Sequence, residues 1–321
     1  MNMRNALLIA VFFLICFGLG YPTLNRYDPR ASGGLGDTIV YYDLAVHGPR
    51  ASLDPQLKFR LLIPLLSRPV TRLAAGHIGT WEPVFFGFLV VNSLFTALTA
   101  WLLVVVARRF TASEPAALLA AALYLLNFET SNIRVSGMVD SGEGLALMAI
   151  VWSLLTGRLW LLPVWGLLGT ASKETFVPLC MVFSAGWWFF DRRAMVLSAG
   201  VAALVGIAVL QSLVLGHWMW PWEFAAALGP QGNHWRALRE NVLDQNLLYC
   251  IVWLLPLGLP RLRRLPLAWV AASLAAVLVD FALVTWHISS AGAAARPFFS
   301  FAGPLLSLSA AMYLSERDLA A

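Results

Sequence analysis

The sequence predicts an all-α fold, a bundle of about ten transmembrane helices that forms one integral-membrane domain over residues 1–321. Hydrophobic residues make up 60% of the chain and charged residues only 12%, and the mean hydropathy is +0.74. These values lie well outside the range of soluble globular domains. Because each span needs about 20 mainly apolar residues, we expect no room for a separate soluble domain.

Ten apolar segments are the predicted spans. The first follows Arg4 and imitates a signal peptide, but no small-x-small cleavage site precedes Tyr21, so we expect it to be retained. The third and fifth segments are short, which is typical of helices that end partway through the membrane and line a cavity. The segments are 5–21, 84–107, 115–127, 140–156, 159–171, 175–190, 194–216, 243–260, 266–286 and 297–314.

The distribution of charge predicts the orientation of the chain. With a cytoplasmic N-terminus, the inner loops carry ten basic residues and the outer loops beyond the first carry five, as the positive-inside rule requires. Twelve of the 17 acidic residues fall on the outer side, which marks it as the functional face unless acids merely avoid the inner one. We therefore expect both termini in the cytoplasm and an extracytoplasmic active face.

Other classes of function find no support in the sequence. The net charge of +5 comes from basic residues at segment ends, so no nucleic-acid partner is expected. Cys16, Cys180 and Cys250 lie in apolar runs without a CxxC motif and are predicted to be core residues. His217 and His234 lack a zinc-ligand spacing, and the tryptophans around them are typical of an aromatic belt.

The first outer loop, residues 22–83, is the most polar part of the chain. Asp37 and Asp43 lie on either side of Tyr41 and Tyr42. Carboxylates at a membrane surface cost desolvation energy when they are held against apolar groups. Two of them beside aromatic rings therefore predict a site in this loop.

The later part of this loop is predicted to form one or two short amphipathic helices in the plane of the interface. Arg60, Arg68 and Arg72 share one helical face by multiples of four residues, and leucines occupy the other. For Arg68 and Arg72 we favour a structural interpretation, in which surface arginines extend (snorkel) their charged ends toward water. Arg60 is closer to the acidic residues, where it could bind the phosphate of a substrate.

Two further polar clusters could complete an outer site. Asp140 and Glu143 are three residues apart and share a helical face, although a capping box would explain the pair as well. Arg134 lies in the same loop. Lys173 and Glu174 are adjacent, and side chains about 100° apart on a helix cannot satisfy each other. We expect their partners among the charged residues of the first two outer loops.

The order of these features resembles the GT-C superfamily of integral-membrane glycosyltransferases. A first span, a long outer loop with Gly36-Asp37 and tyrosines, the segment 59–65 and a later Lys-Glu-Thr carry the resemblance over about residues 5–190. The likeness extends to small bacterial, uncharacterised members of the superfamily. It implies a bacterial cytoplasmic (inner) membrane, a polyprenyl-phosphate-linked sugar as donor and a glycan or lipid acceptor on the outer side. It also implies a first-loop aspartate as general base or metal ligand, namely Asp37, with Asp43 as the second candidate.

The chemistry of sugar transfer needs the same residue types. A carboxylate takes the acceptor proton, and cationic groups stabilise the departing phosphate. Asp37 is the first candidate for the base, ahead of Asp43 and Glu174, and a divalent cation, Mg²⁺ or Mn²⁺, at Asp37 or Asp43 stays an open alternative. The remaining candidate ligands for phosphate or substrate are Arg60, Arg134, Lys173, Arg296, Tyr41, Tyr42, Asp140 and Glu143.

Two other functions compete with this prediction. A carrier or flippase for a lipid-linked or small anionic solute would use the same charges along a path through the membrane. In a non-catalytic partner of an envelope-assembly complex, the acidic residues would serve only to keep the loops solvated. The enzyme prediction requires Asp37, Arg60 and Glu174 to converge on one outer cavity with walls at 127–143 and 170–175. The sequence does not predict an oligomeric state.

Overall fold

The computed structural model confirms the all-helical class. It describes residues 3–27, 36–50, 53, 57–79, 81–135, 137–220, 223, 233–287 and 294–317. Within these ranges the regular elements are helices, and no strand occurs. The parts of the first outer loop at 28–35, 51–52 and 54–56 lie outside the described residues.

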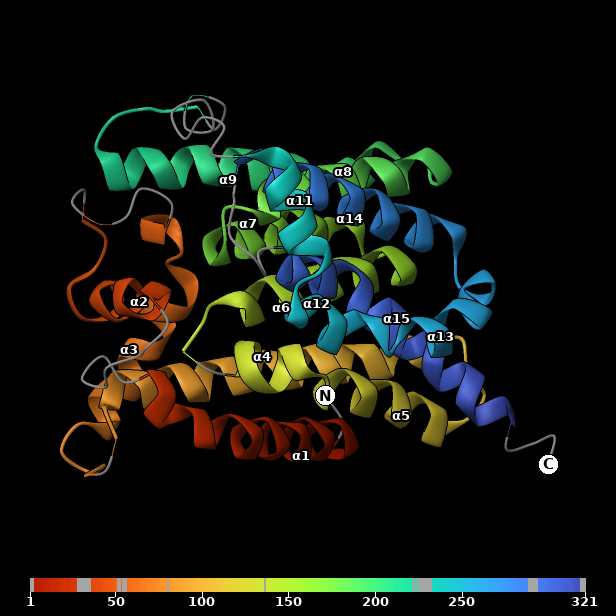
Figure 1. Cartoon of the computed structure of the whole chain (residues 1–321), viewed down its shortest axis with the longest axis horizontal. Coiled ribbons are helices and arrows are strands. Elements are labelled where there is room, and N and C mark those ends of the chain that lie inside the picture. Colours follow the sequence, from red (N-terminus) through yellow and green to blue (C-terminus); the bar gives the residue numbers. More distant parts are fainter. Residues whose placement is uncertain are drawn as a thin grey trace.

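In Figure 1 several of the long helices, among them α1, α4 and α9, run along the long axis of the molecule, and α14 and α15 run obliquely to them. α4 and α15 form the centre of the bundle, because 72% and 78% of the residues in their most apolar 18-residue stretches are buried. In α1 only 22% of the corresponding stretch is buried. α4 packs against α1, α5 and α6, and α15 packs against α5 and α14. The bundle helices are α1 (Met3–Gly20), α4 (Pro83–Ala107), α5 (Glu114–Leu125), α6 (Asp140–Thr156), α7 (Leu162–Ser172), α8 (Phe176–Phe190), α9 (Ser198–Leu215), α14 (Leu267–His287) and α15 (Ala295–Arg317).

Local sequence explains where several of these helices begin and end. Glu82 caps α4, since its carboxylate accepts hydrogen bonds from the backbone N–H groups of Val84 and Phe85. α6 and α9 end at Gly157 and Gly216, whose φ angles of 73° and 76° are left-handed and favour glycine. The shorter elements are η3 (Thr130–Arg134), η4 (Leu159–Leu161), η5 (Ala194–Leu197), α11 (His234–Val242), α12 (Gln245–Leu247), η6 (Leu248–Val252), α13 (Leu255–Gly258) and η7 (Leu259–Arg264).

The prediction of about ten spans is confirmed only in part. Each predicted segment contains a helix, but among the described residues five helices are long and apolar enough to cross a membrane, or six if the bent pair 234–252 and 255–264 counts as one span. α5, α7 and α8 are shorter apolar helices. At 1.5 Å per residue, the 12 residues of α5 extend about 18 Å, less than the roughly 30 Å of hydrocarbon.

The first outer loop folds at one end of the bundle, the left end in Figure 1, as η1 (Tyr21–Tyr27), α2 (Gly36–His47), η2 (Leu57–Phe59) and α3 (Leu62–Ala74). The predicted amphipathic helix is confirmed in α3, which buries Ile63 and Ser67 and exposes Leu66 and Leu73. α3 passes close to α4 at Gly87, where a Cβ atom would lie only 2.9 Å from the carbonyl oxygen of Ser67.

The basic residues of this region do not share one helical face as predicted. Arg60 precedes α3, because the helix begins only at Leu62. Arg68 does not snorkel toward water but donates hydrogen bonds to the backbone carbonyls of Leu44 and Ala45 at the end of α2. Arg72 is exposed on α3, as the snorkelling interpretation requires.

Candidate functional site

The adjacent residues Lys173 and Glu174 each form an ion pair with a residue far away in the chain. Arg60 donates to Glu174 through two nitrogens, with Nε–Oε2 at 2.7 Å and Nη2–Oε1 at 2.5 Å. Lys173 Nζ lies 2.7 Å from Asp140 Oδ1. Lys173 has an extended backbone between α7 and α8, with φ −160° and ψ 134°, so successive side chains diverge. The prediction of partners in the first two outer loops is confirmed.

Arg60 also connects this turn to α2. Its Nη1 donates to the hydroxyl oxygen of Tyr41 at 2.5 Å, and both side chains are buried. Burial raises the pKa of Tyr41 well above its ordinary value. The phenol therefore stays neutral, and its own proton remains available for a further acceptor.

A second buried cluster holds Arg134 inside the bundle. Its Nη2 donates to Ser300 Oγ at 2.7 Å and its Nη1 to the backbone carbonyl of Asp140 at 3.3 Å. Ser300 in turn donates to Glu143 Oε2 at 2.9 Å, and the guanidinium lies over the ring of Phe299. Arg134 and Glu143 are fully buried. These contacts tie η3, α6 and α15 together.

The capping-box interpretation of Asp140 and Glu143 is wrong. α6 begins at Asp140 itself, its N-cap residue is Val139, and no side chain caps it. The carboxylate of Asp140 pairs with Lys173 instead, and that of Glu143 accepts from Ser300.

Glu129 is the third acid of this interior region. It is completely buried in the turn before η3, and one of its oxygens has no hydrogen-bond partner among the described residues. Burial raises the pKa of Glu129 to about 7, against the opposing charge of Arg134. The thiol of Cys250 lies 3.8 Å from the other oxygen. All three cysteines are buried and free, as the sequence predicts for core residues.

Two glycines let α6 approach these groups. A Cβ atom on Gly142 would collide with the hydroxyl of Ser172 on α7, and one on Gly144 would collide with Nη1 of Arg134. Polar residues of the cluster therefore alternate with glycines in the segment Ser141-Gly142-Glu143-Gly144, and a side chain at either glycine would collide with a neighbour.

Replacing Gly144 with alanine should lower the free energy of unfolding by about 1–3 kcal/mol, because the added methyl group displaces the buried guanidinium of Arg134. Thermal unfolding of the purified protein in detergent measures the change. Gly18→Ala on α1 is the matched control, since a Cβ atom there meets nothing within 4 Å. Equal melting temperatures for the two variants would contradict the role assigned to Gly144.

Asp37 and Arg296 differ from the other candidates because neither side chain makes a hydrogen bond or ion pair with another described residue. Asp37 lies in the first turn of α2 and Arg296 in the first turn of α15, and both are partly exposed. Asp37, Tyr41 and Asp140 all lie within electrostatic range of Arg296. A carboxylate and a guanidinium that pair with no other described residue thus lie within electrostatic range of each other and of Tyr41.

The other first-loop candidates already have partners. Asp43 pairs with Arg50 and accepts from His47 Nδ1 at 2.7 Å. Burial raises the pKa of Asp43, but the hydrogen bonds from Arg50 and His47 outweigh this effect and lower the pKa below its ordinary value. Tyr42 donates to Glu82 Oε1 at 3.2 Å, the residue that caps α4. Arg60 and Glu174 therefore meet, no hydrogen bond joins Asp37 to either, and the convergence of all three on one outer cavity stays a prediction.

The network also contains residues that sequence analysis missed. Ser300 bridges Arg134 and Glu143, and Asn92 on α4 accepts from Ser141 at 2.5 Å and donates to the carbonyl of Met138. Their only sequence signal was a polar residue within an apolar span, which is a weak indication of function.

A metal site stays a prediction. Among the residues that the structure describes, no three His, Cys, Asp or Glu side chains gather closely enough to hold an ion.

A scan against protein-family models finds no match to this chain, and a search of the curated proteins finds no relative. The resemblance to GT-C glycosyltransferases therefore stays a prediction, and the functional argument depends on the residues of the site.

Proposed function

We propose that this protein is an integral-membrane glycosyltransferase of about ten spans that moves a sugar from a polyprenyl-phosphate donor to a glycan or lipid acceptor. The reaction would take place at the extracytoplasmic face of a bacterial cytoplasmic membrane. The observation that supports this function most directly is that the carboxylate of Asp37 lies within electrostatic range of the guanidinium of Arg296, and that neither group pairs with another described residue. Both groups lie beside a network of buried ion pairs.

In the proposed reaction, Asp37 takes the proton of the acceptor hydroxyl, and the acceptor oxygen attacks the anomeric carbon of the donor sugar. The bond between that carbon and the phosphate oxygen breaks, and its electron pair leaves with the lipid phosphate. The configuration at the anomeric carbon is inverted. The guanidinium of Arg296 stabilises the phosphate charge, for which a planar pair of N–H donors is well suited.

The remaining cations have other roles in this proposal. All three nitrogens of Arg60 already donate to Glu174 and Tyr41, Lys173 pairs with Asp140, and Arg134 is fully enclosed. We therefore assign Arg60 to positioning Tyr41. Tyr41 could donate its free proton to a sugar hydroxyl.

Transfer itself can be tested with the purified protein in lipid nanodiscs and polyprenyl-phosphate-linked sugars extracted from bacterial membranes. Mass spectrometry should detect free polyprenyl phosphate together with a glycosylated acceptor. Donors that all stay intact in the presence of membrane-derived glycans and lipids would contradict the proposed function.

Replacing Arg296 with glutamine should lower the transfer rate about 10²-fold, because a donor aimed at the developing phosphate charge is lost. Arg296→Lys keeps the charge without the bidentate geometry, so its transfer rate should lie between those of the original protein and Arg296→Gln. The matched control is Arg72→Gln, an exposed arginine on α3, which should transfer at the normal rate. Normal transfer by Arg296→Gln would remove Arg296 from the site.

A carrier is the second candidate because a buried carboxyl group lies well inside a candidate span. Asp280 on α14 is buried, and one of its oxygens has no partner among the described residues. Glu143 and Lys173 lie within electrostatic range of it. Intramembrane acids of this kind are typical of transport pathways. Uptake of an unmodified substrate into sealed proteoliposomes would favour this function over transfer.

A further inference from the structure

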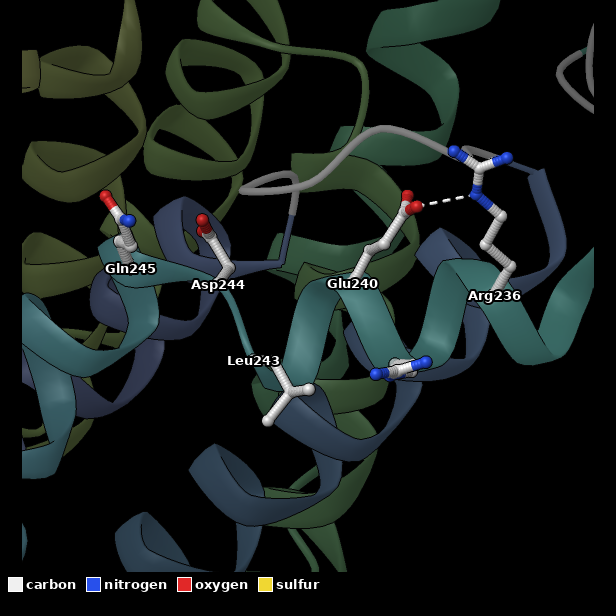
Figure 2. A pocket seen from close by; sticks show the side chains of 6 residues that line it. Arg236, Glu240, Leu243, Asp244 and Gln245 are labelled. Atoms are coloured by element: carbon white, nitrogen blue, oxygen red, sulfur yellow. Dashed lines mark hydrogen bonds and ion pairs between the residues drawn. The ribbon is translucent and has the colours of Figure 1, made fainter.

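A polar pocket lies where α11 ends and α12 begins, outside the network described above (Figure 2). Its volume is about 590 Å³, which is enough for a small polar ligand. In Figure 2 the side chains of Arg236 and Glu240 lie next to each other, and Leu243 points in another direction. The lining residues are Arg236, Arg239, Glu240, Leu243, Asp244 and Gln245.

The pocket contains a cation and a carboxylate, Arg239 and Asp244, that form no ion pair with another described residue. Arg236 pairs with Glu240 at 2.6 Å, but Arg239 makes no ion pair with a described residue. Asp244 precedes α12 without capping it, and its Oδ2 atom is buried with no hydrogen-bond partner among the described residues. A buried carboxylate oxygen without a donor is costly. A ligand that supplies an N–H group would satisfy it.

The residues around this pocket favour a position at the depth of lipid headgroups. Trp235 is 80% exposed and Trp286 53% exposed, and tryptophans of this kind favour the boundary between membrane and water. The ring of His234, at the start of α11, stacks on Trp286, with the ring centroids 4.7 Å apart. Trp286 ends the candidate span of α14, so α11 is held at the end of a helix that could cross the membrane.

Apolar groups adjoin the charged ones. Val242 is 51% exposed and Leu243 is 69% exposed, next to Asp244 in the chain. An exposed leucine in the wall of a charged pocket is suited to contact acyl chains while the headgroup occupies the polar part. On the other face of α11, Ala237 and Asn241 are buried.

We propose that this pocket binds the headgroup of a bilayer phospholipid that carries one phosphate and one primary ammonium, as in phosphatidylethanolamine. Arg239 binds the phosphate and Asp244 accepts hydrogen bonds from the ammonium. Two guanidinium groups and two carboxylates make the pocket electrically neutral, which matches a zwitterionic headgroup better than an anionic one. The site is independent of the proposed sugar transfer.

The probes are three lipids with the same acyl chains: phosphatidylethanolamine, phosphatidylcholine and phosphatidylglycerol. Native mass spectrometry of the purified full-length protein in detergent measures their affinities. We expect phosphatidylethanolamine to bind at least about 10-fold more tightly than the other two, because the quaternary amine of choline has no N–H donor and phosphoglycerol has no cation.

Variants separate the two halves of the pocket. Arg239→Gln should weaken phosphatidylethanolamine binding about 10-fold, and Asp244→Asn should remove the preference for it over phosphatidylcholine. Arg192→Gln is the matched control, because Arg192 lies over the ring of Trp188, away from the pocket, and the variant should bind all three lipids normally. Melting temperatures equal to that of the original protein establish that each variant is folded.

Three outcomes would overturn the proposal. Equal affinity for the three lipids would contradict recognition of the headgroup. Normal binding by Arg239→Gln would contradict the position of the phosphate. Displacement of the lipid by an equimolar amount of soluble O-phosphoethanolamine would show that the pocket takes a free phosphate ester and not a membrane lipid.

Discussion

Replacing Asp37 with asparagine should lower sugar transfer about 10²- to 10⁴-fold, because the acceptor hydroxyl would lose its general base. Asparagine has nearly the same shape as aspartate, and Asp37 makes no hydrogen bond or ion pair with another described residue. The melting temperature should therefore stay the same. Release of polyprenyl phosphate from the donor, measured at saturating donor and acceptor, reports the loss.

Asp43→Asn is the matched control for this experiment. Asp43 is on the same helix, α2, but is already paired with Arg50 and His47, so its loss should change the rate far less. If Asp37→Asn transferred sugar at the original rate, Asp37 would not be the base. If Asp43→Asn alone were inactive, the order of the two candidates would be reversed.

Replacing Lys173 with methionine should lower the free energy of unfolding by about 3–5 kcal/mol, the usual cost of leaving a buried charge without its partner. Lys173 and Asp140 are 6% and 1% exposed in their side chains, so water cannot take the place of the lost ammonium group. Thermal or denaturant unfolding in detergent should show the largest decrease of any single variant considered above.

The double variant Lys173→Met with Asp140→Leu distinguishes a lost pair from a general loss of packing. Apolar residues that replace both members of a buried pair are often neutral for stability, so the double variant should recover most of the lost stability. Arg193→Gln breaks a solvent-exposed pair with Asp191 and should change stability by less than about 1 kcal/mol. A double variant as unstable as Lys173→Met would contradict the pairing.

The two expected results describe different parts of one arrangement. Ion pairs such as those of Lys173 and Arg60 neutralise charges that would otherwise be costly among apolar helices. Asp37 and Arg296 are left outside these pairs. An enzyme site needs such a division, because supporting groups must be satisfied while reacting groups remain available to the substrate.

Much of the fold could be predicted from the sequence. Apolar segments locate the helices, and the pattern of leucines and arginines in 62–74 predicts an amphipathic α3. The number of spans could not be derived, because hydropathy measures transfer into lipid and does not show how long a helix extends before it breaks. The 12-residue helix α5 is an example.

The candidate site was predictable only in its residue types. The sequence by itself determined that the chain consists of apolar helices that could span a membrane. It also determined that Lys173 and Glu174 need partners elsewhere, because unpaired charges are costly in lipid. Tertiary structure alone decided that Arg60 pairs with Glu174 and that Arg134 is enclosed. It also left Asp37 without an ion pair to another described residue, whereas Asp43 pairs with Arg50. The reason is that electrostatic pairing depends on the distance between side chains in space, which helix packing sets and separation along the chain does not.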